Sequence, residues 1–348
     1  MAAFQMTPDG TDPARIPAKK LYTGASMPGI GLGTFGSDHA DAALVANVVR
    51  EALRMGYRYI DCAACYGNEP EVGTALRGAL DGGLAREDLF ILSKLWNDRH
   101  SPADVIESCK KSIRDLGVSY LDCYLVHWPF PNYHEPGCDG DARNPASRPY
   151  IHAEFMETWR AMEQLCDMGL VRHIGTSNVT IPKLQMILAD VRIKPAVNEM
   201  ELHPTFQQGE LFQYCLDNGV LPIGYSPIGS PGRPARDRMP DDLVDTEMPA
   251  VREIAAARGI HPVEVCLKWA SQRGQVPIPF TTKRKNALSN IRALASDPLT
   301  PAEMDQMRGC ERNCRLIKGQ VFLWQGATDW LDLWDVDGTI PGWNGYEK

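Results

Sequence analysis

The sequence predicts an α/β fold, a (β/α)8 TIM barrel, formed by a single domain over residues 1–348. Two observations lead to this prediction. Eight short runs rich in β-branched and aromatic residues recur along the chain, and longer runs with the apolar spacing of amphipathic helices lie between them. Alternating strands and helices favour a parallel sheet, and eight strands close into a barrel. The barrel is expected at about residues 18–315, followed by a tail at 316–348.

The expected strands lie at residues 28–35, 57–63, 89–95, 120–128, 172–178, 195–202, 220–228 and 275–280. Helical spacing of apolar residues is clearest between them at 41–56, 101–117 and 151–169. Each of these three runs ends on a glycine shortly before the next strand, as a helix C-cap would. The order of elements is therefore strand, then helix, along the barrel.

Two long loops and a tail depart from this repeat. Residues 129–150 and 229–249 are rich in proline and glycine and follow the fourth and seventh expected strands. The carboxyl ends of barrel strands carry the active site, so both loops are expected to wall or cover a pocket. Two interpretations stay open for the tail, an arm packed on the barrel and a flap that adds aromatic wall to the pocket. It holds half of the chain's eight tryptophans: Trp324, Trp330, Trp334 and Trp343.

Charge and hydropathy argue against several kinds of partner. A net charge of −8 disfavours nucleic acid, because phosphate binding needs a concentrated basic face, and the basic run at 283–285 is short. No stretch approaches the roughly 18 apolar residues of a membrane span, and the first residues lack an apolar signal core. We expect a cytoplasmic protein with a small-molecule ligand, monomeric or weakly homo-oligomeric, without a membrane or nucleic-acid partner.

Ten cysteines in such a chain predict reduced and mostly buried thiols. The spacing of Cys62 and Cys65 also suits a redox pair, although no helix is expected to begin there. Cys310 and Cys314 have a spacing that zinc ligands use, but no second cysteine or histidine pair lies nearby. We therefore predict no metal site.

Gly31, Gly33 and Gly36 form the G-x-G-x-x-G pattern of a dinucleotide-binding turn. That turn should follow a strand, open a helix and meet an acidic residue about twenty positions later. Here the glycines lie within the first expected strand, and Glu51, at the right offset, lies in the middle of a helix. An open-sheet dehydrogenase is thus the weaker alternative. We expect the glycines to permit a close approach of strand and loop, and any cofactor to be held elsewhere.

Asp61, Tyr66, Lys94 and His127 stand at or just beyond the ends of three successive expected strands. Asp61, Lys94 and His127 follow one another at intervals of 33 residues, so we expect them at one height on the catalytic face of the barrel. An ammonium about 4 Å from a tyrosine favours the phenolate by roughly 4 kcal/mol at an effective dielectric near 20. Lys94 would thus lower the pKa of Tyr66, with Asp61 holding Lys94 and His127 positioning a carbonyl. The set predicts an acid catalyst for carbonyl reduction.

The chain resembles the aldo-keto reductase family over roughly residues 18–317. The strings that carry the resemblance are GYRYIDCAACYGNE, ILSKLW, YLVHWP, GTSN, PAVNEMELHP and GYSPIGS. The resemblance implies an (α/β)8 barrel that binds NAD(P)H in extended form without the glycine turn and reduces aldehydes and ketones to alcohols. It implies Tyr66 as proton donor, with Asp61, Lys94 and His127 as its partners.

The resemblance also implies residues that contact the cofactor and the substrate. The nicotinamide end is expected at Thr34, Phe35, Asp61, Ser177, Asn178, Glu199 and Tyr225, and the pyrophosphate at Ser226, Ile228 and Ser230. The segment after the eighth strand, where a 2′-phosphate would lie, contributes Phe280, Thr281, Thr282, Lys283, Asn286 and Asn290. The substrate is expected against Phe35, Trp96, His127 and Trp128.

Two departures from the family pattern bear on the cofactor. Glu199 stands where glutamine is usual; it suits the carboxamide, and its charge would also favour the oxidised nicotinamide. Phe280 replaces a lysine that contacts the 2′-phosphate, and Asn286 stands where arginine is frequent. Four neighbours remain able to reach a phosphate: Thr281, Thr282, Lys283 and Arg284. NADP (as NADPH) is therefore favoured, and NAD (as NADH) is the alternative.

Together these features predict an NAD(P)-dependent oxidoreductase acting on CH–OH groups, an aldehyde reductase or an alcohol dehydrogenase depending on direction. The polar, proline-rich loops and the tryptophan-rich tail favour sugar-like or other polar carbonyls as substrates. The alternative is a cofactor-binding regulatory or structural barrel without turnover. The intact set of four residues and the pocket aromatics disfavour that alternative.

Overall fold

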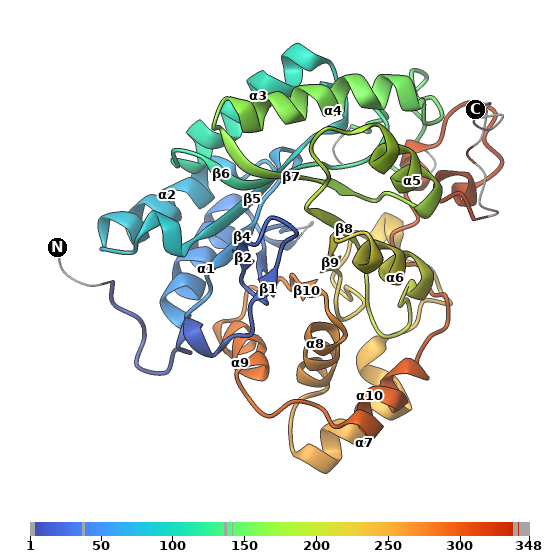
Figure 1. The fold of residues 1–348 in the computed structure, drawn as a ribbon. Helices are drawn as coiled ribbons and strands as arrows, with labels where there is room; N and C mark the ends of the chain where they lie inside the picture. The colour runs from blue at the N-terminus through green and yellow to red at the C-terminus, as the bar shows by residue number, and fades with distance from the viewer. Residues whose placement is uncertain (1–3, 37–38, 136–137, 141, 337–339, 341–348) are drawn as a thin grey trace.

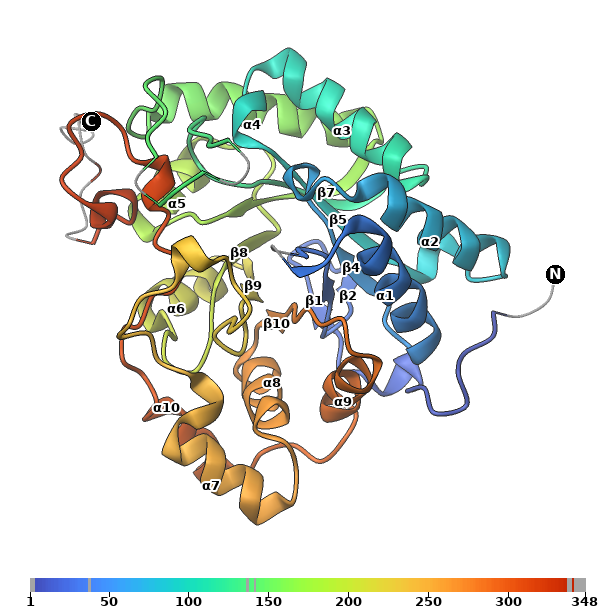
Figure 2. The ribbon, with the colours of Figure 1, turned by 180° about the vertical axis from the view of Figure 1, so that it is seen from behind.

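The computed structural model describes residues 4–36, 39–135, 138–140, 142–336 and 340. In these residues a ring of strands is surrounded by helices, and the ring is seen from its two ends in Figure 1 and Figure 2. The predicted (β/α)8 barrel is confirmed.

Eight strands form one sheet in which every neighbouring pair is parallel. They are β3 (Leu32–Gly33), β4 (Tyr59–Asp61), β5 (Phe90–Leu95), β6 (Leu121–Val126), β7 (Val171–Ser177), β8 (Val197–Glu201), β9 (Leu221–Tyr225) and β10 (Val276–Pro277). The N–H groups of Gly31 and Gly33 donate to the carbonyls of Pro277 and Pro279, at 3.0 and 3.1 Å, which closes the barrel between its first and last strands. All eight strands lie within one residue of the expected ranges.

Helices follow the strands and cover the barrel. They are α1 (Ala42–Met55), α2 (Glu69–Asp81), α3 (Pro102–Leu116), α4 (His152–Asp167), α5 (Ile181–Asp190), α6 (Gly209–Asp217), α7 (Pro249–Arg258), α8 (Pro262–Arg273), α9 (Arg284–Leu294) and α10 (Pro301–Arg308). The three helices expected from apolar spacing are confirmed as α1, α3 and α4. Asp41 caps the start of α1 through the Leu44 N–H, and Gly56 ends it with a left-handed φ of 113°.

A hairpin of β1 (Lys19–Lys20) and β2 (Ser26–Met27) lies at the centre of the ring in Figure 1 and was not expected from the sequence. Leu21 and Met27 of this hairpin pack in one cluster with Tyr59, Phe90 and Leu221, which begin β4, β5 and β9. The hairpin therefore plugs the amino end of the barrel. This leaves the carboxyl ends of the strands for the site.

The glycine-rich segment 31–36 is not a dinucleotide turn. A Cβ on Gly31 would lie 2.4 Å from the Tyr59 ring, and one on Gly33 would lie 3.1 Å from the Ile278 carbonyl oxygen. Helix α1 begins only at Ala42, after Gly36 and the loop that follows it. The expectation of close approach at these glycines is confirmed, and the open-sheet alternative is wrong.

Both expected long loops are present at the carboxyl ends of strands. Residues 127–151 join β6 to α4, and residues 226–248 join β9 to α7 with short 3-10 turns at Ala235–Asp237 and Asp245–Glu247. The tail forms 3-10 turns at Gln320–Phe322 and Trp330–Leu333 and lies beside α5 in both ribbon views.

The described part of the tail packs on the barrel. Trp334 and Phe322 contact the ring of Trp128, with centroids 5.5 and 4.6 Å away, and Trp128 is left 5% exposed. A buried ion pair between Lys183 of α5 and Asp335 fixes the end of this arm. Trp343, also expected in the tail, lies outside the described residues.

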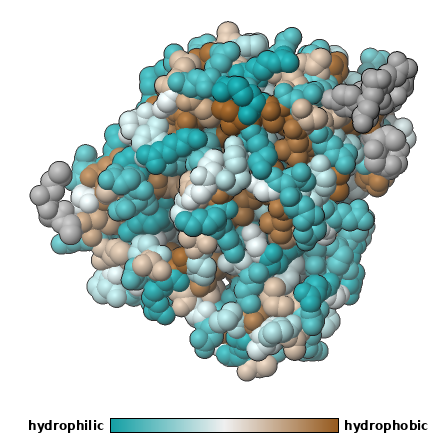
Figure 3. Space-filling model, viewed as in Figure 1, coloured by the Kyte–Doolittle hydropathy of each residue, from teal (hydrophilic) through white to brown (hydrophobic). Residues whose placement is uncertain are grey.

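On the face shown in Figure 3, hydrophobic residues form small groups among hydrophilic ones. Within the described residues, no helix combines the length and the apolar character needed to cross a bilayer. Among the exposed large hydrophobic side chains, Phe35 is 46% exposed and belongs to the expected site.

Candidate active site

The predicted catalytic residues lie at the carboxyl ends of neighbouring strands. Asp61 ends β4, Lys94 is the fifth residue of β5, His127 directly follows β6, and Tyr66 ends the 3-10 turn Ala64–Tyr66. The sheet register pairs Asp61 with Leu92, and Lys94 with Leu125, so each next residue lies two positions further along its strand. The hydrogen-bond register is thus staggered from strand to strand, as in other barrels with tilted strands, and the expected single height along the barrel axis stays a prediction.

Lys94 is the centre of the site. Its Nζ forms an ion pair with Asp61 and lies 3.4 Å from the Tyr66 hydroxyl, 3.1 Å from the Cys62 carbonyl and 3.3 Å from Oε1 of Glu199. The side chains of Lys94, Asp61 and Glu199 are 0%, 1% and 3% exposed. The predicted contacts among Asp61, Tyr66 and Lys94 are thus present, and Glu199 joins them.

Charge and burial set the protonation of these groups. Burial alone would lower the pKa of Lys94, but Asp61 and Glu199 raise it well above its ordinary value, so Lys94 is an ammonium. Burial raises the pKa of Tyr66, and Lys94 offsets only part of that rise. The predicted lowering by Lys94 therefore exists, but the predicted net fall is wrong in the protein alone, because removing the phenolate from water costs more.

His127 is a neutral imidazole beside this centre. Burial, followed by the charge of Lys94, lowers its pKa well below the ordinary histidine value. Its Nδ1 lies 3.5 Å from Sγ of Cys65, and its ring lies 5.9 Å from the Tyr66 ring and 5.2 Å from the Trp96 ring. An uncharged His127 can orient a polar group but has no extra proton to give.

Asp61 is fixed by residues that the sequence analysis did not assign to this task. The Tyr59 hydroxyl donates to Oδ2 of Asp61 at 2.6 Å, and the Thr34 hydroxyl donates to the Asp61 carbonyl at 2.8 Å. Tyr59 precedes Asp61 by two residues on the same strand, so both side chains point to one face. That alternation was the available signal for Tyr59.

Two of the predicted substrate residues flank Tyr66 and His127. The Phe35 ring lies 5.1 Å from the Tyr66 ring, and Trp96 contacts His127. Trp128 instead lies beneath the tail and belongs to the cluster with Phe130 and Phe322. The contact of Trp128 with a substrate stays a prediction.

A polar network connects β7, β8 and β9 beside the catalytic tetrad. This name is used for the four residues Asp61, Tyr66, Lys94 and His127. Asn178 donates to the His127 carbonyl at 3.0 Å and to Ser177 Oγ at 3.1 Å, and it accepts from the Tyr225 hydroxyl at 2.8 Å. The register places Ser177 opposite Glu199. The residues expected around a nicotinamide ring are thus brought together with Tyr66 and Lys94.

Backbone strain marks the same region. Asn178, Ser226 and Ser230 have left-handed φ values of 58°, 51° and 39°, which residues other than glycine rarely adopt. All three were predicted to contact a cofactor. Strained backbone at binding residues is typical of functional sites.

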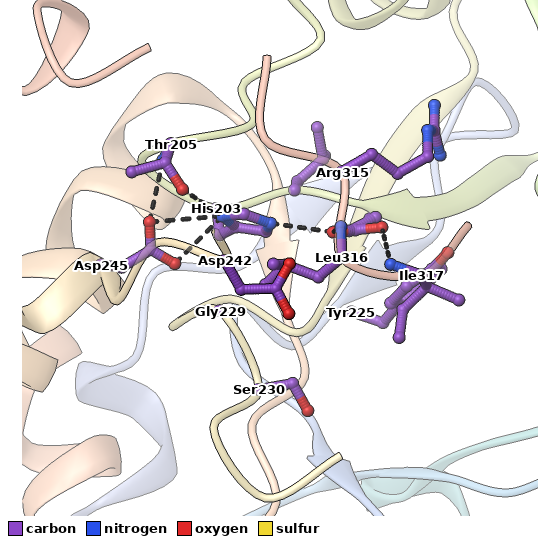
Figure 4. Close-up of polar contacts among 12 residues, drawn as sticks. His203, Thr205, Tyr225, Gly229, Ser230, Asp242, Asp245, Arg315, Leu316 and Ile317 are labelled. Carbon is purple, nitrogen blue, oxygen red and sulfur yellow. Dashed lines mark hydrogen bonds and ion pairs between the residues drawn. The ribbon is translucent and has the colours of Figure 1, made fainter. Parts of the chain in front are cut away.

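A second buried cluster holds the loop 226–248 and the tail against β8 (Figure 4). His203 contacts Oε1 of Glu201 at 2.9 Å and Oδ2 of Asp245 at 3.0 Å. Glu201 accepts the N–H groups of Leu316 and Ile317 at 2.7 and 3.0 Å. Burial opposes the charge on His203, but the hydrogen bonds to Asp245 and Glu201 raise its pKa to about 9. The sequence analysis did not identify this cluster.

The segment after β10 is open to solvent at the start of α9. Thr282, Lys283 and Asn286 are exposed, Phe280 and Thr281 are half-buried, and Asn290 is buried. Arg284 forms a two-point ion pair with Asp9, at 2.7 and 2.9 Å. Of the two cations expected to reach a phosphate, Arg284 is thus held by Asp9, whereas Lys283 forms no ion pair with any described residue.

The residues present fit a nicotinamide dinucleotide. Oε2 of Glu199 is buried and has no hydrogen-bond partner among the described residues, so it can accept a carboxamide N–H. Tyr225 offers an aromatic face, and a turn with left-handed residues such as Ser226 and Ser230 is of the kind whose backbone N–H groups can bind a phosphate.

Comparison with known proteins gives consistent matches. The model of the aldo/keto reductase family matches residues 29–312. An aldo/keto reductase of Synechocystis sp. is 39% identical over 317 residues, covering 90% of this chain and 95% of its own. The human aldo-keto reductase family 1 member A1 is 40% identical over 300 residues, covering 85% and 90%. A Bombyx mori aldo-keto reductase, solved in complex with NADP, superposes with a TM-score of 0.77 at 29% identity, covering 87% and 95%.

Proposed function

Because this chain belongs to the aldo/keto reductase family, we propose that it reduces aldehydes or ketones reversibly to alcohols with NADPH as the preferred cofactor. The observation that carries the proposal is the Tyr66 hydroxyl 3.4 Å from Nζ of Lys94, which Asp61 holds in a buried ion pair. This arrangement serves a proton donor whose conjugate base needs a nearby positive charge.

The residues divide the reaction between them. A bound reduced nicotinamide supplies the hydride. Tyr66 donates the proton to the carbonyl oxygen, and Lys94 stabilises the phenolate that remains. His127 is neutral and orients the carbonyl oxygen toward Tyr66. Asp61, held by Tyr59, keeps Lys94 charged and in place.

The cofactor is held by residues from three regions. Ser177, Asn178, Glu199 and Tyr225 would hold the nicotinamide, together with Thr34 and Phe35. The turn with Ser226, Ile228 and Ser230 binds the pyrophosphate. Lys283, with Thr281 and Thr282, supports NADPH over NADH, and the NADP in the Bombyx mori relative supports the same preference.

We propose a sugar-like or other polar carbonyl as substrate. Aromatic faces of Phe35 and Trp96 flank the polar groups of Tyr66 and His127, a combination that suits polyhydroxy compounds. The expected result is higher kcat/KM for polyhydroxy aldehydes or ketones than for apolar aldehydes of equal length. Equal turnover of apolar aldehydes, with no activity on polyhydroxy carbonyls, contradicts this assignment.

The test combines binding and turnover. Titration of tryptophan fluorescence with NADPH and with NADH measures both affinities, and Tyr66→Phe is then compared with the wild type. We expect Tyr66→Phe to bind NADPH normally and to lose about two to four orders of magnitude in kcat. Tyr22→Phe, on the hairpin at the opposite end of the barrel, is the matched control and keeps its activity. Binding without turnover of any carbonyl in the wild type supports a regulatory barrel instead.

A further inference from the structure

Two carboxyl groups share one ammonium in a buried part of the site. Asp61 forms an ion pair with Lys94, and Oε1 of Glu199 lies 3.3 Å from the same Nζ. The three side chains have almost no exposed surface. Two carboxylates and one ammonium would therefore meet where water cannot screen them, which leaves an excess of one negative charge.

Nothing described around Glu199 compensates a second negative charge. Its Oε2 is buried without a hydrogen-bond partner among the described residues. Asp61 is close enough to accept a hydrogen bond from a protonated Glu199. Two carboxylates beside one cation in a dry site cannot both stay ionised, so one of them keeps a proton. Burial, and then the charge of Asp61, raises the pKa of Glu199 well above its ordinary value.

The other ionisable groups that face Glu199 do not supply this proton near neutral pH. They are Tyr59 on β4, Lys94 on β5, Cys123 on β6, Tyr66 on the 3-10 turn and Tyr225 on β9, while β7 places the non-ionisable Ser177 opposite Glu199. Burial raises the pKa of the three phenols and of the thiol, so they stay neutral, and Lys94 stays charged. Glu199, beside Asp61, is therefore the group that can lose a proton in response to a new charge.

We propose that the Glu199–Asp61 pair carries one shared proton when the site is free or holds the reduced cofactor, and releases it when the positively charged oxidised nicotinamide binds. The proposal rests on the proposed function, because it places the nicotinamide ring beside Glu199. It makes Glu199 a residue that sets, through pH, the balance between the two oxidation states of the cofactor.

The step involves a proton and no electron transfer. The O–H bond of the shared proton breaks, the proton passes to the buffer, and the carboxylate left behind faces the cationic ring. Opposite charges within about 4–6 Å favour the ionised form of a carboxyl, and the neutral reduced ring gives no such benefit. By linkage, the site then binds the oxidised cofactor more tightly as pH rises.

The first experiment measures dissociation constants for NADP+ and NADPH between pH 6 and pH 8 by tryptophan fluorescence. The 2′-phosphate titrates in both forms, so its effect cancels in the ratio of the two constants. The upper limit of pH 8 avoids the titration of His203, whose pKa is about 9. We expect the preference for NADP+ over NADPH to grow by about three- to tenfold per pH unit in the wild type, since one released proton gives at most tenfold.

Two variants assign the effect. Glu199→Gln removes the proton that can leave, so its preference is expected to be independent of pH. Glu69→Gln is the matched control: Glu69 is also a buried carboxyl with a raised pKa, but it accepts hydrogen bonds from Ser93 of β5 and Ser112 of α3. Glu69→Gln is expected to keep the wild-type slope. A wild-type preference that does not change with pH, or an unchanged slope in Glu199→Gln, overturns the proposal.

A direct measurement does not depend on either variant. Mixing wild-type protein with saturating NADP+ in weak buffer at pH 7 is expected to release up to one proton per site, read with an indicator dye, while NADPH releases none beyond the 2′-phosphate contribution. Equal release by both forms overturns the inference and leaves the proposed function intact. Failure to bind either cofactor contradicts the proposed function itself.

Discussion

Strand β8 carries two buried glutamates, Glu199 and Glu201, whose surroundings shift their pKa values in opposite directions. Glu199 shares Lys94 with Asp61, and its pKa is raised because burial and the charge of Asp61 outweigh the charge of Lys94. Glu201 is equally buried, yet its pKa is lowered, because His203, Arg315 and the Leu316 N–H all favour the carboxylate. The two clusters thus share one strand and one kind of acid but differ in protonation.

The difference teaches what keeps a buried carboxylate ionised. The Glu201 cluster contains two cations, His203 and Arg315, for its two acids, and it adds backbone donors from the tail. The Lys94 cluster has one cation for two acids, and an oxygen of Glu199 remains without a described partner. The Glu201 cluster fixes loops in place. The Lys94 cluster leaves a proton that a ligand can displace.

The largest effect is expected from Lys94→Met, which removes the cation that Asp61 and Glu199 share in the Lys94 cluster. Leaving buried acids without their cation costs about 3–5 kcal/mol of unfolding free energy, and kcat is expected to fall about 10²- to 10⁴-fold. Urea unfolding at pH 6 and pH 8 measures the loss, which should be smaller at pH 6, where the acids take up protons more readily. Lys268→Met, buried against carbonyls and Ser296, is the control and should leave kcat unchanged. An unchanged kcat in Lys94→Met contradicts its role.

The Glu201 cluster, through His203, is expected to make the free energy of unfolding fall in alkaline solution. The pKa of His203 is about 9 in the folded protein and 6.5 as the reference, so the folded state holds the extra proton. This contribution is complete below pH 6.5 and is lost as pH rises through about 9, by at most about 3 kcal/mol. Urea unfolding between pH 6.5 and 9.5 tests it, with His203→Gln as comparison. If the variant loses stability over this range as steeply as the wild type, His203 is not the group responsible.

Replacing each glutamate of β8 by glutamine compares the clusters directly. Glu201→Gln places an NH2 group against donors that need an acceptor and is expected to cost about 2 kcal/mol. Glu199→Gln should remain within about 1 kcal/mol of the wild type, because a protonated carboxyl and a carboxamide have similar shape and no charge is lost. Thermal and urea unfolding at pH 7 measure both. Equal losses at the two positions would remove the distinction between the clusters.

The fold was predictable because its signals are local. Runs of β-branched and aromatic residues located the eight strands, and apolar spacing with glycine caps located α1, α3 and α4. The segment Gly31–Gly36 does not open a helix, and this excluded a dinucleotide turn. The β1–β2 hairpin escaped because its strands are two residues long and carry no alternation. Its position as a plug depends on the closed barrel, which no local pattern encodes.

The site was predictable to the level of residues but not of protonation. The spacing of Asp61, Lys94 and His127 led to the tetrad. The protonated state of Glu199, in contrast, depends on the contact of Asp61 with the same Lys94. The net rise in the pKa of Tyr66 depends likewise on burial in three dimensions. His203 and Asp245 are 42 residues apart, so their contact with Glu201 had no signal in spacing. Tyr59, by contrast, could have been found from strand alternation.

The smallest effect is expected from Tyr59→Phe, which removes a single hydrogen bond from the Lys94 cluster. The Tyr59 hydroxyl donates to Asp61 at 2.6 Å, and its loss is expected to cost about 1 kcal/mol of unfolding free energy and less than about tenfold in kcat. Tyr57→Phe is the matched control, because the equally buried Tyr57 hydroxyl donates to a backbone carbonyl, that of Ala287, at 2.9 Å. Unfolding and steady-state rates of both variants separate the two contributions. A fall in kcat in Tyr59→Phe alone identifies the hydroxyl as a positioning group for Asp61, whereas equal rates in both variants mean that Lys94 suffices to hold Asp61.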